Sequence, residues 1–207
     1  MSKIDLTPGR EHFPALHVKD DGKERIYFDG AGGGQVPKKA LDALVYYLTY
    51  KNANEGGYFK TSVETTILEK EARADVAEFI NADGWQNIVT GPNSTELIYK
   101  LTWALSRMLK PGDEIVTTRM EHGSNQDVWT ILKDRGVIIK YIEVNGDECI
   151  LDYDMAEKLI TDKTKLVTFG LASNVSGTIN DVKRLVKIAH ERNAWVYVDA
   201  VHYSPHG

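Results

Sequence analysis

The segment Trp195-Val-Tyr-Val-Asp-Ala-Val-His-Tyr-Ser-Pro-His-Gly207 sets the interpretation of the whole chain. Its first four residues have the β-branched and aromatic composition of a buried strand, and they run directly into the carboxylate of Asp199. A charge at the end of a buried strand is unfavourable unless it is paired or hydrogen-bonded. Asp199 is therefore expected to cap a neighbouring loop, to bind Mg²⁺, or to pair with a protonated heterocyclic nitrogen.

Other β-rich segments precede this one, at residues 87–90, 114–118, 137–142 and 165–170. Helical patterns separate most of them, as at 97–108 and 181–193. Alternating strands and helices predict an α/β fold, with a mostly parallel sheet and helices on both faces. Sheets of this kind bind ligands at the carboxyl ends of their strands.

The first third of the chain has a different pattern. Residues 1–35 indicate an extended arm with a short strand at 25–29, followed by a helix from Pro37 to about Tyr50 and a loop at 51–60. Ser62 is expected to cap the next helix. The apolar residues of that helix expected to face inward are Ile67, Val76, Phe79 and Ile80.

The composition is that of an ordinary globular protein, with 42% hydrophobic and 27% charged residues over 207 positions. A net charge of −5 and scattered Lys and Arg residues argue against a nucleic-acid partner. No apolar run is long enough to cross a membrane, so no membrane partner is expected. Cys149 is the single cysteine and cannot form an internal disulfide, which favours a reducing, cytoplasmic location.

Polar residues follow the expected strands. Gly91–Glu96 opens a helix whose free N–H groups favour an anion, and Ser94 and Thr95 add hydroxyl donors. The alternative is a plain helix start with Ser94 or Thr95 as N-cap. His122 can stack on a flat ring or move protons, or it can be a loop histidine with its hydrogen bonds satisfied.

Two further positions complete this set. Asn174 offers a donor after the fourth strand, or else braces a turn, and His202 follows Asp199. The metal interpretation of Asp199 lacks a second carboxylate at a nearby strand end, so no metal site is expected. The interpretation in which Asp199 pairs with a protonated heterocyclic nitrogen is supported by an anion site, a histidine that can stack on a ring and a polar asparagine, all expected at the same edge of the sheet. An aromatic phosphate ester with a basic ring nitrogen describes pyridoxal phosphate (PLP).

These residues resemble the class V aminotransferase family, and more closely its cysteine desulfurase-like branch. The resemblance runs from Tyr27-Phe-Asp-Gly-Ala31 through "STE", "MEHGSN", "ASNVSGT" and "VDAVHYSPHG". It implies a small amino-acid substrate and a role for each residue. Ser94 and Thr95 bind the PLP phosphate, and His122 stacks on the ring and is a candidate proton shuttle. Asn174 reaches the ring substituents, Asp199 pairs with the ring nitrogen, and His202 binds the phenolic oxygen.

The resemblance also implies what this chain does not contain. The family's Schiff-base lysine lies downstream of the aspartate, so no catalytic lysine is expected among these residues. The chain is expected to be an N-terminal portion, with an arm and helix over 1–61 and a partial PLP-binding large domain over 62–207. Because family members are dimers and the 54–60 loop resembles a segment that reaches the partner's site, a homo-oligomer is expected.

Alternative functions stay open. The isolated chain is expected to be inactive, and it can instead be a non-enzymatic remnant or scaffold with weak or no PLP binding. A dinucleotide-binding oxidoreductase would use Gly30 and Gly32, but the third glycine of that motif is replaced by Gln35. The substrate is left open, as is the choice among desulfuration, transamination, elimination and epimerisation.

Overall fold

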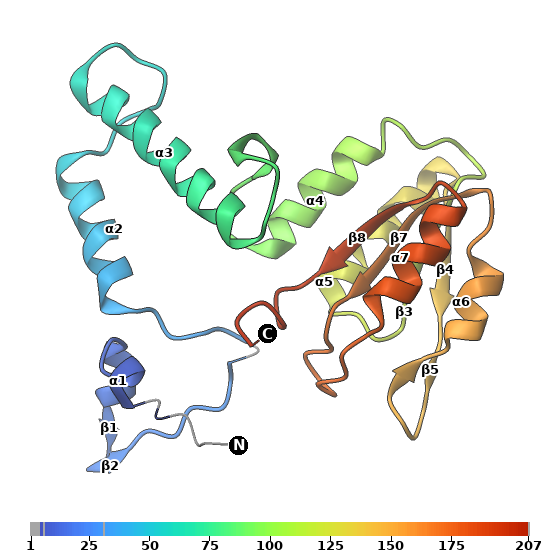
Figure 1. The fold of residues 1–207 in the computed structure, drawn as a ribbon, viewed down its shortest axis with the longest axis horizontal. Helices are drawn as coiled ribbons and strands as arrows, with labels where there is room; N and C mark the ends of the chain where they lie inside the picture. The colour runs from blue at the N-terminus through green and yellow to red at the C-terminus, as the bar shows by residue number, and fades with distance from the viewer. Residues whose placement is uncertain (1–4, 6, 31, 207) are drawn as a thin grey trace. The chain divides into compact units, whose positions relative to one another are not determined.

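The computed structural model describes residues 5, 7–30 and 32–206 (Figure 1). The chain forms two compact units, with the boundary in the sequence between Thr90 and Gly91. Ala31 of the glycine-rich run and the terminal Gly207 fall outside the described residues. A domain boundary after residue 61 stays a prediction.

Unit 1 is mostly helical where it is described. Its elements are α1 (Thr7–Arg10), the 3₁₀ segment η1 (Pro14–His17), β1 (Lys19–Asp20), β2 (Lys23–Glu24), α2 (Lys38–Tyr50), α3 (Lys60–Phe79) and η2 (Trp85–Asn87). The helix expected after Pro37 is confirmed as α2. Lys51 and Glu64 form an ion pair between the end of α2 and α3, and the hydroxyls of Tyr47 and Thr65 lie 3.1 Å apart.

Ser62 does not cap α3, because the helix already begins at Lys60. The Ser62 hydroxyl instead donates to the Asn54 carbonyl at 2.5 Å and accepts the Gly57 N–H at 2.7 Å. These bonds hold the preceding loop against the first turn of the helix. The side chains expected to face inward are exposed instead: Ile67, Val76, Phe79 and Ile80.

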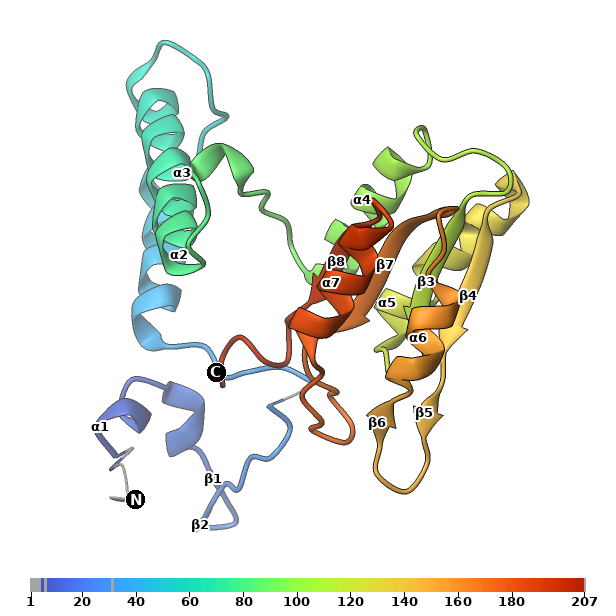
Figure 2. The same cartoon turned by 45° about the vertical axis from the view of Figure 1, so that its right-hand side comes forward.

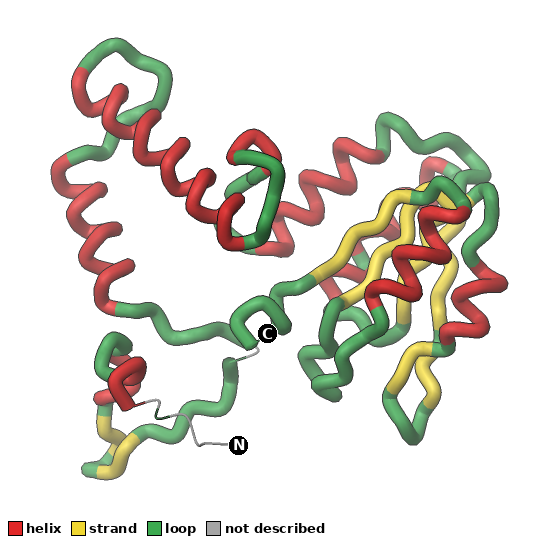
Figure 3. Tube along the Cα trace, viewed as in Figure 1, coloured by secondary structure: helices red, strands yellow, loops and turns green. Residues whose placement is uncertain are grey.

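Two of the expected strands are not formed. Residues 25–29 run as loop, which Figure 3 shows in green; of the expected strand at 87–90, Asn87 ends η2 and residues 88–90 run as loop. A strand needs a neighbour for its N–H and C=O groups, and none of the strands in the described ranges pairs with either segment. The dinucleotide-binding interpretation required a strand before the glycine run, so the structure removes its basis.

Unit 2 carries the predicted sheet. Its elements are α4 (Ser94–Leu105), β3 (Glu114–Thr118), α5 (Gly123–Gln126), the 3₁₀ segment η3 (Val128–Arg135), β4 (Ile138–Ile142), β5 (Val144–Asn145), β6 (Ile150–Leu151), α6 (Tyr153–Leu159), β7 (Thr164–Gly170), α7 (Val182–Glu191) and β8 (Trp195–Asp199). The strand order is β4-β3-β7-β8, and every neighbouring pair is parallel. The α/β fold with a parallel sheet is confirmed.

Helices cover both faces of this sheet (Figure 2). Because side chains alternate along a strand, Val167 and Phe169 of β7 face α6 and α7, whereas Leu166 faces α4 and η3. The first face buries Val116, Ile142, Leu185 and Ala189, and the second buries Ile98, Ile115, Trp129 and Leu132. Each fully buried Val, Ile, Leu or Phe side chain among these contributes about 1.5–3 kcal/mol to folding.

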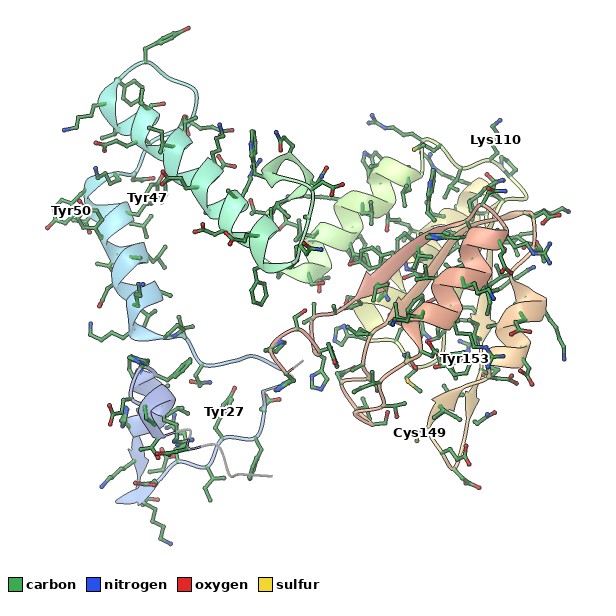
Figure 4. All side chains as sticks on the ribbon, in the orientation of Figure 1. Tyr27, Tyr47, Tyr50, Lys110, Cys149 and Tyr153 are labelled. Carbon is green, nitrogen blue, oxygen red and sulfur yellow. The ribbon has the colours of Figure 1, made fainter. Side chains whose placement is uncertain are left out.

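The turns that return the chain to the sheet depend on local chemistry. Asp181 caps α7 by accepting the Arg184 N–H at 3.0 Å. Gly136 ends η3 with a left-handed φ of +80°, and its carbonyl accepts the Gly112 N–H at 2.8 Å. Cys149 lies exposed in the β5–β6 turn (Figure 4), where its thiol contacts the Gly146 carbonyl at 3.6 Å.

We predict that Gly136→Ala destabilises the protein more than Gly112→Ala. Both positions have a left-handed φ, which costs an alanine about 1–2 kcal/mol. An added Cβ at Gly136 lies 2.9 Å from the Cβ of Pro111, whereas one at Gly112 meets nothing within 4 Å. Overpacking adds roughly 1–3 kcal/mol, measurable as a lower urea midpoint by circular dichroism. Equal losses in the two variants would contradict the close approach to Pro111.

Candidate functional site

The carboxyl ends of β3, β7 and β8 form one edge of the sheet, because these strands are parallel neighbours. Gly170 at the end of β7 is opposite Asp199 at the end of β8. The Leu171 N–H donates to the Asp199 carbonyl at 2.7 Å and extends this pairing by one residue. His122 follows the end of β3 by four residues, so His122 and Asp199 lie at the same edge of the sheet.

The start of α4 is capped by a residue that the sequence analysis did not choose. The side chain of Asn93 accepts the Glu96 N–H at 2.8 Å, so Asn93 is the N-cap and Ser94 and Thr95 are the first two helical residues. The alternative in which Ser94 or Thr95 caps the helix is therefore wrong. The N–H groups of these two residues have no intrahelical acceptor, which is the arrangement that suits an anion.

His122 has a local structural role as well as a candidate functional one. It is the N-cap of α5, and its Nδ1 accepts the Ser124 N–H at 3.2 Å and lies 2.7 Å from the Ser124 hydroxyl. Since Nδ1 is an acceptor, the neutral ring carries its proton on Nε2. His122 is exposed, and its hydrogen bonds to Ser124 use Nδ1 and not Nε2.

Asn174 lies in the tight turn that follows β7. Ser173 closes this turn, because its hydroxyl accepts the N–H groups of Val175 and Ser176, each at 3.2 Å. The turn is completed by Gly177, which has a left-handed φ of +75°. Ser173, and not Asn174, therefore braces the turn, and the Asn174 side chain is exposed.

Asp199 is half-buried, and one of its carboxylate oxygens, Oδ1, accepts the Val201 N–H at 3.0 Å. This bond is the loop cap that the sequence allowed as an alternative, and it uses one of the two oxygens. His202 lies in the turn that follows, with its ring 5.5 Å from that of His206. The two residues expected to hold the ring nitrogen and the phenolic oxygen thus lie within the short segment formed by the end of β8 and the turn that follows it.

Tyr197 is a site residue that the sequence analysis missed. It lies two residues before Asp199, on the same face of β8, and its ring packs edge-on against Trp129 at 6.1 Å. Burial and the nearby Asp199 charge raise the pKa of Tyr197. Tyr197 also packs against the buried cluster that includes Ile98 of α4, so the strand that ends in Asp199 lies against that helix. Its place in a period-two strand pattern was the available signal.

Glu121 is the second missed residue, although it adjoins His122 in the "MEHGSN" motif. Its carboxylate accepts the Gly170 N–H at 3.0 Å, the Thr118 hydroxyl at 2.5 Å and the Asn125 amide at 2.6 Å. Burial is the main cause of a raised Glu121 pKa, to which the Asp199 charge also contributes. The expectation that no carboxylate accompanies Asp199 at a nearby strand end is therefore wrong.

The presence of Glu121 does not by itself support the interpretation of Asp199 as an Mg²⁺ ligand. Within the described ranges no group of three or more His, Cys, Asp or Glu side chains is arranged to hold a metal ion. The donor set fits PLP better. The uncapped N–H groups of Ser94 and Thr95 suit a phosphate, an imidazole suits an aromatic ring, and the Asp199 carboxylate suits a protonated nitrogen.

The chain matches known proteins over nearly all of its length. A family model described as Aminotransferase class-V matches residues 26–207. A probable cysteine desulfurase from Synechocystis sp. is 36% identical over 201 residues, an alignment that covers 95% of this chain and 47% of that protein. The chain spans about half the length of the curated relatives it matches.

Solved structures agree with this match. The apo cysteine desulfurase from Thermococcus onnurineus has a TM-score of 0.83 and 33% identity, over 97% of this chain and 48% of that one. A C-DES mutant with glycine covalently linked to its PLP cofactor has a TM-score of 0.73 and 23% identity, over 94% of this chain and 50% of that one, and supports the fold alone. The chain belongs to the class-V aminotransferase family, a PLP-dependent family that includes cysteine desulfurases.

Proposed function

We propose that this chain is the N-terminal, cofactor-binding portion of a cysteine desulfurase-like enzyme that acts on a small amino acid. The observation that carries the proposal is the position of Asp199 at the end of β8, in register with β7 and on the same strand face as Tyr197. Tyr197 packs on the same buried cluster as Ile98 of α4, the helix that begins at Ser94. The negative charge of Asp199 and the anion site at the start of α4 are therefore assigned to the same edge of the sheet.

Each residue has a separate task in this proposal. Ser94 and Thr95 bind the phosphate with N–H and hydroxyl donors, and Asp199 holds a proton on the pyridine nitrogen. His122 covers one ring face and carries a proton on Nε2 that can move to or from a bound substrate. Asn174 and His202 donate to the ring substituents. When bound, the cofactor supplies an electron sink for the pair released at the substrate α-carbon.

The complete reaction requires a lysine that this chain is not expected to supply. The resemblance places that lysine downstream of the aspartate, and no lysine follows Asp199 in this sequence. We therefore assign that residue to a further segment, and leave desulfuration, transamination, elimination and epimerisation as alternatives. A cytoplasmic location also belongs to this proposal. Among the described helices none is both long and apolar enough to cross a membrane.

A second candidate is a scaffold that binds PLP weakly or not at all. Two observations favour it: His122 already caps α5, and Asp199 already accepts the Val201 N–H. Both side chains thus have structural roles that need no ligand. Cofactor titration of substituted chains separates the two candidates.

We predict that Asp199→Asn weakens PLP binding by roughly tenfold or more, because a hydrogen bond between charged groups contributes about 1.5–3 kcal/mol. The measurement is a fluorescence titration of the chain with PLP. Asp147→Asn is the matched control, since Asp147 is exposed in the β5–β6 turn and should leave the affinity unchanged. If both variants bind as the wild type does, Asp199 has no role in cofactor binding.

We predict that the 207-residue chain releases no sulfide from cysteine and forms no borohydride-stable PLP adduct at one unique lysine. The reason is the missing lysine, without which the phosphate site, one stacking face and one ion pair hold the cofactor reversibly. Intact-mass and peptide analysis after reduction checks this result. An adduct confined to a single lysine, together with turnover, would show the assignment wrong.

We predict that the chain forms a homo-oligomer. In the described part of the sheet, β4 and β8 are edge strands with unpaired N–H and C=O groups, which proteins generally cover. The 54–60 loop, which resembles a segment reaching toward a partner's site, is consistent with this assembly. Sedimentation velocity should show a dimer or larger species, and a clean monomer well above micromolar concentration would rule it out.

A further inference from the structure

The amide of Asn125 has an orientation that its neighbours fix. This side chain is fully buried in α5, and its Oδ1 lies 3.3 Å from the Trp129 indole nitrogen and 2.7 Å from the Thr168 hydroxyl. An indole N–H is a donor only, so it must face the amide oxygen. The amide nitrogen of Asn125 is then directed at Glu121, where it donates to Oε2 at 2.6 Å.

The other carboxylate oxygen of Glu121 also accepts hydrogen bonds. Oε1 accepts the backbone N–H of Gly170 at 3.0 Å and the Thr118 hydroxyl at 2.5 Å. Position 121 must therefore offer acceptors in two directions at once, toward α5 and toward β7. A carboxyl group does so, whether ionised or protonated on the Thr118 side, whereas an amide has one acceptor atom and would place its NH₂ against another donor.

These bonds join three parts of the candidate site. Glu121 lies in the turn after β3, Asn125 lies in α5, and Gly170 is the last residue of β7 and the register partner of Asp199. His122 is the residue between Glu121 and α5, and it caps that helix. The hydrogen bonds of the Glu121 carboxyl group therefore help to set the position of His122 relative to Asp199.

We propose that Glu121 is a positioning residue, which fixes the β3–α5 turn against the end of β7 and thereby holds His122 at the cofactor edge of the sheet. Its consequence for the cofactor rests on the proposed function. The hydrogen bonds of Glu121 to Thr118, Asn125 and Gly170, which we call the Glu121 clamp, do not depend on the proposed function, because all of them lie within unit 2 of this chain. A displacement of about 0.5 Å or more in a residue of this kind is enough to impair a site.

The test compares the wild-type chain with Glu121→Gln, which keeps the shape of the side chain and removes one acceptor. Long-range ¹H–¹⁵N NMR reports the tautomer of His122, assigned with a His122→Asn variant. The wild type should show the Nε2–H form, and Glu121→Gln should shift it toward an averaged signal. The Trp129 indole resonance should move as well, because its acceptor on Asn125 is disturbed.

Glu148→Gln is the control, because Glu148 is exposed in the β5–β6 turn and should leave both signals in place. Unchanged His122 and Trp129 signals in a folded Glu121→Gln chain would overturn the proposal. If that variant does not fold, hydrogen exchange in the wild type decides. The Gly170 amide should be protected by Glu121, and exchange as fast as that of the exposed Gly146 amide would overturn it.

A PLP titration separates this proposal from the proposed function. If the wild type binds PLP, Glu121→Gln should weaken binding roughly tenfold, through loss of a buried hydrogen-bond acceptor. Unchanged affinity alongside a shifted His122 tautomer would overturn the link between the clamp and the cofactor. If the wild type does not bind PLP, the proposed function fails, and the His122 and Gly170 measurements still decide the role of Glu121.

Discussion

The parallel pairing of β3, β7 and β8 is the constraint on which the candidate site depends. Parallel strands end at the same edge, so their following turns are brought together even though they lie far apart in the sequence. The register that sets Gly170 opposite Asp199 then fixes the distance between two of these turns. A shift of one residue would move Asp199 to the other face of the sheet, away from α4.

Several site residues serve the fold and the proposed chemistry with different atoms. His122 uses Nδ1 to cap α5 and keeps Nε2 for a ligand. Asp199 uses Oδ1 in a turn and keeps its second oxygen. At the start of α4, Asn93 takes the capping role and so releases Ser94 and Thr95. This division of roles explains why structural and functional interpretations of the same residues are compatible.

The sheet of unit 2 was predictable because its strands have strong local signals. The segment 195–199 became β8 with the expected bounds, and 114–118 became β3. Residues 88–90 have a similar β-rich composition, but no strand in the described ranges pairs with them. Whether a segment forms a strand depends on a neighbouring strand as well as on its own composition. Glu121 was missed because a hydrogen-bond network between distant turns leaves no periodic trace in the sequence, whereas the strand pattern that contains Tyr197 was visible but was not used.

The central claim is that Asp199 and its neighbours form a site for a phosphate ester with a protonated pyridine nitrogen. The most direct measurement is ¹⁵N NMR of ring-labelled PLP added to the chain at neutral pH. The account predicts that the bound cofactor has the chemical shift of a protonated ring nitrogen in the wild-type chain. A bound cofactor with an unprotonated ring nitrogen, or no binding at saturating protein, would contradict it.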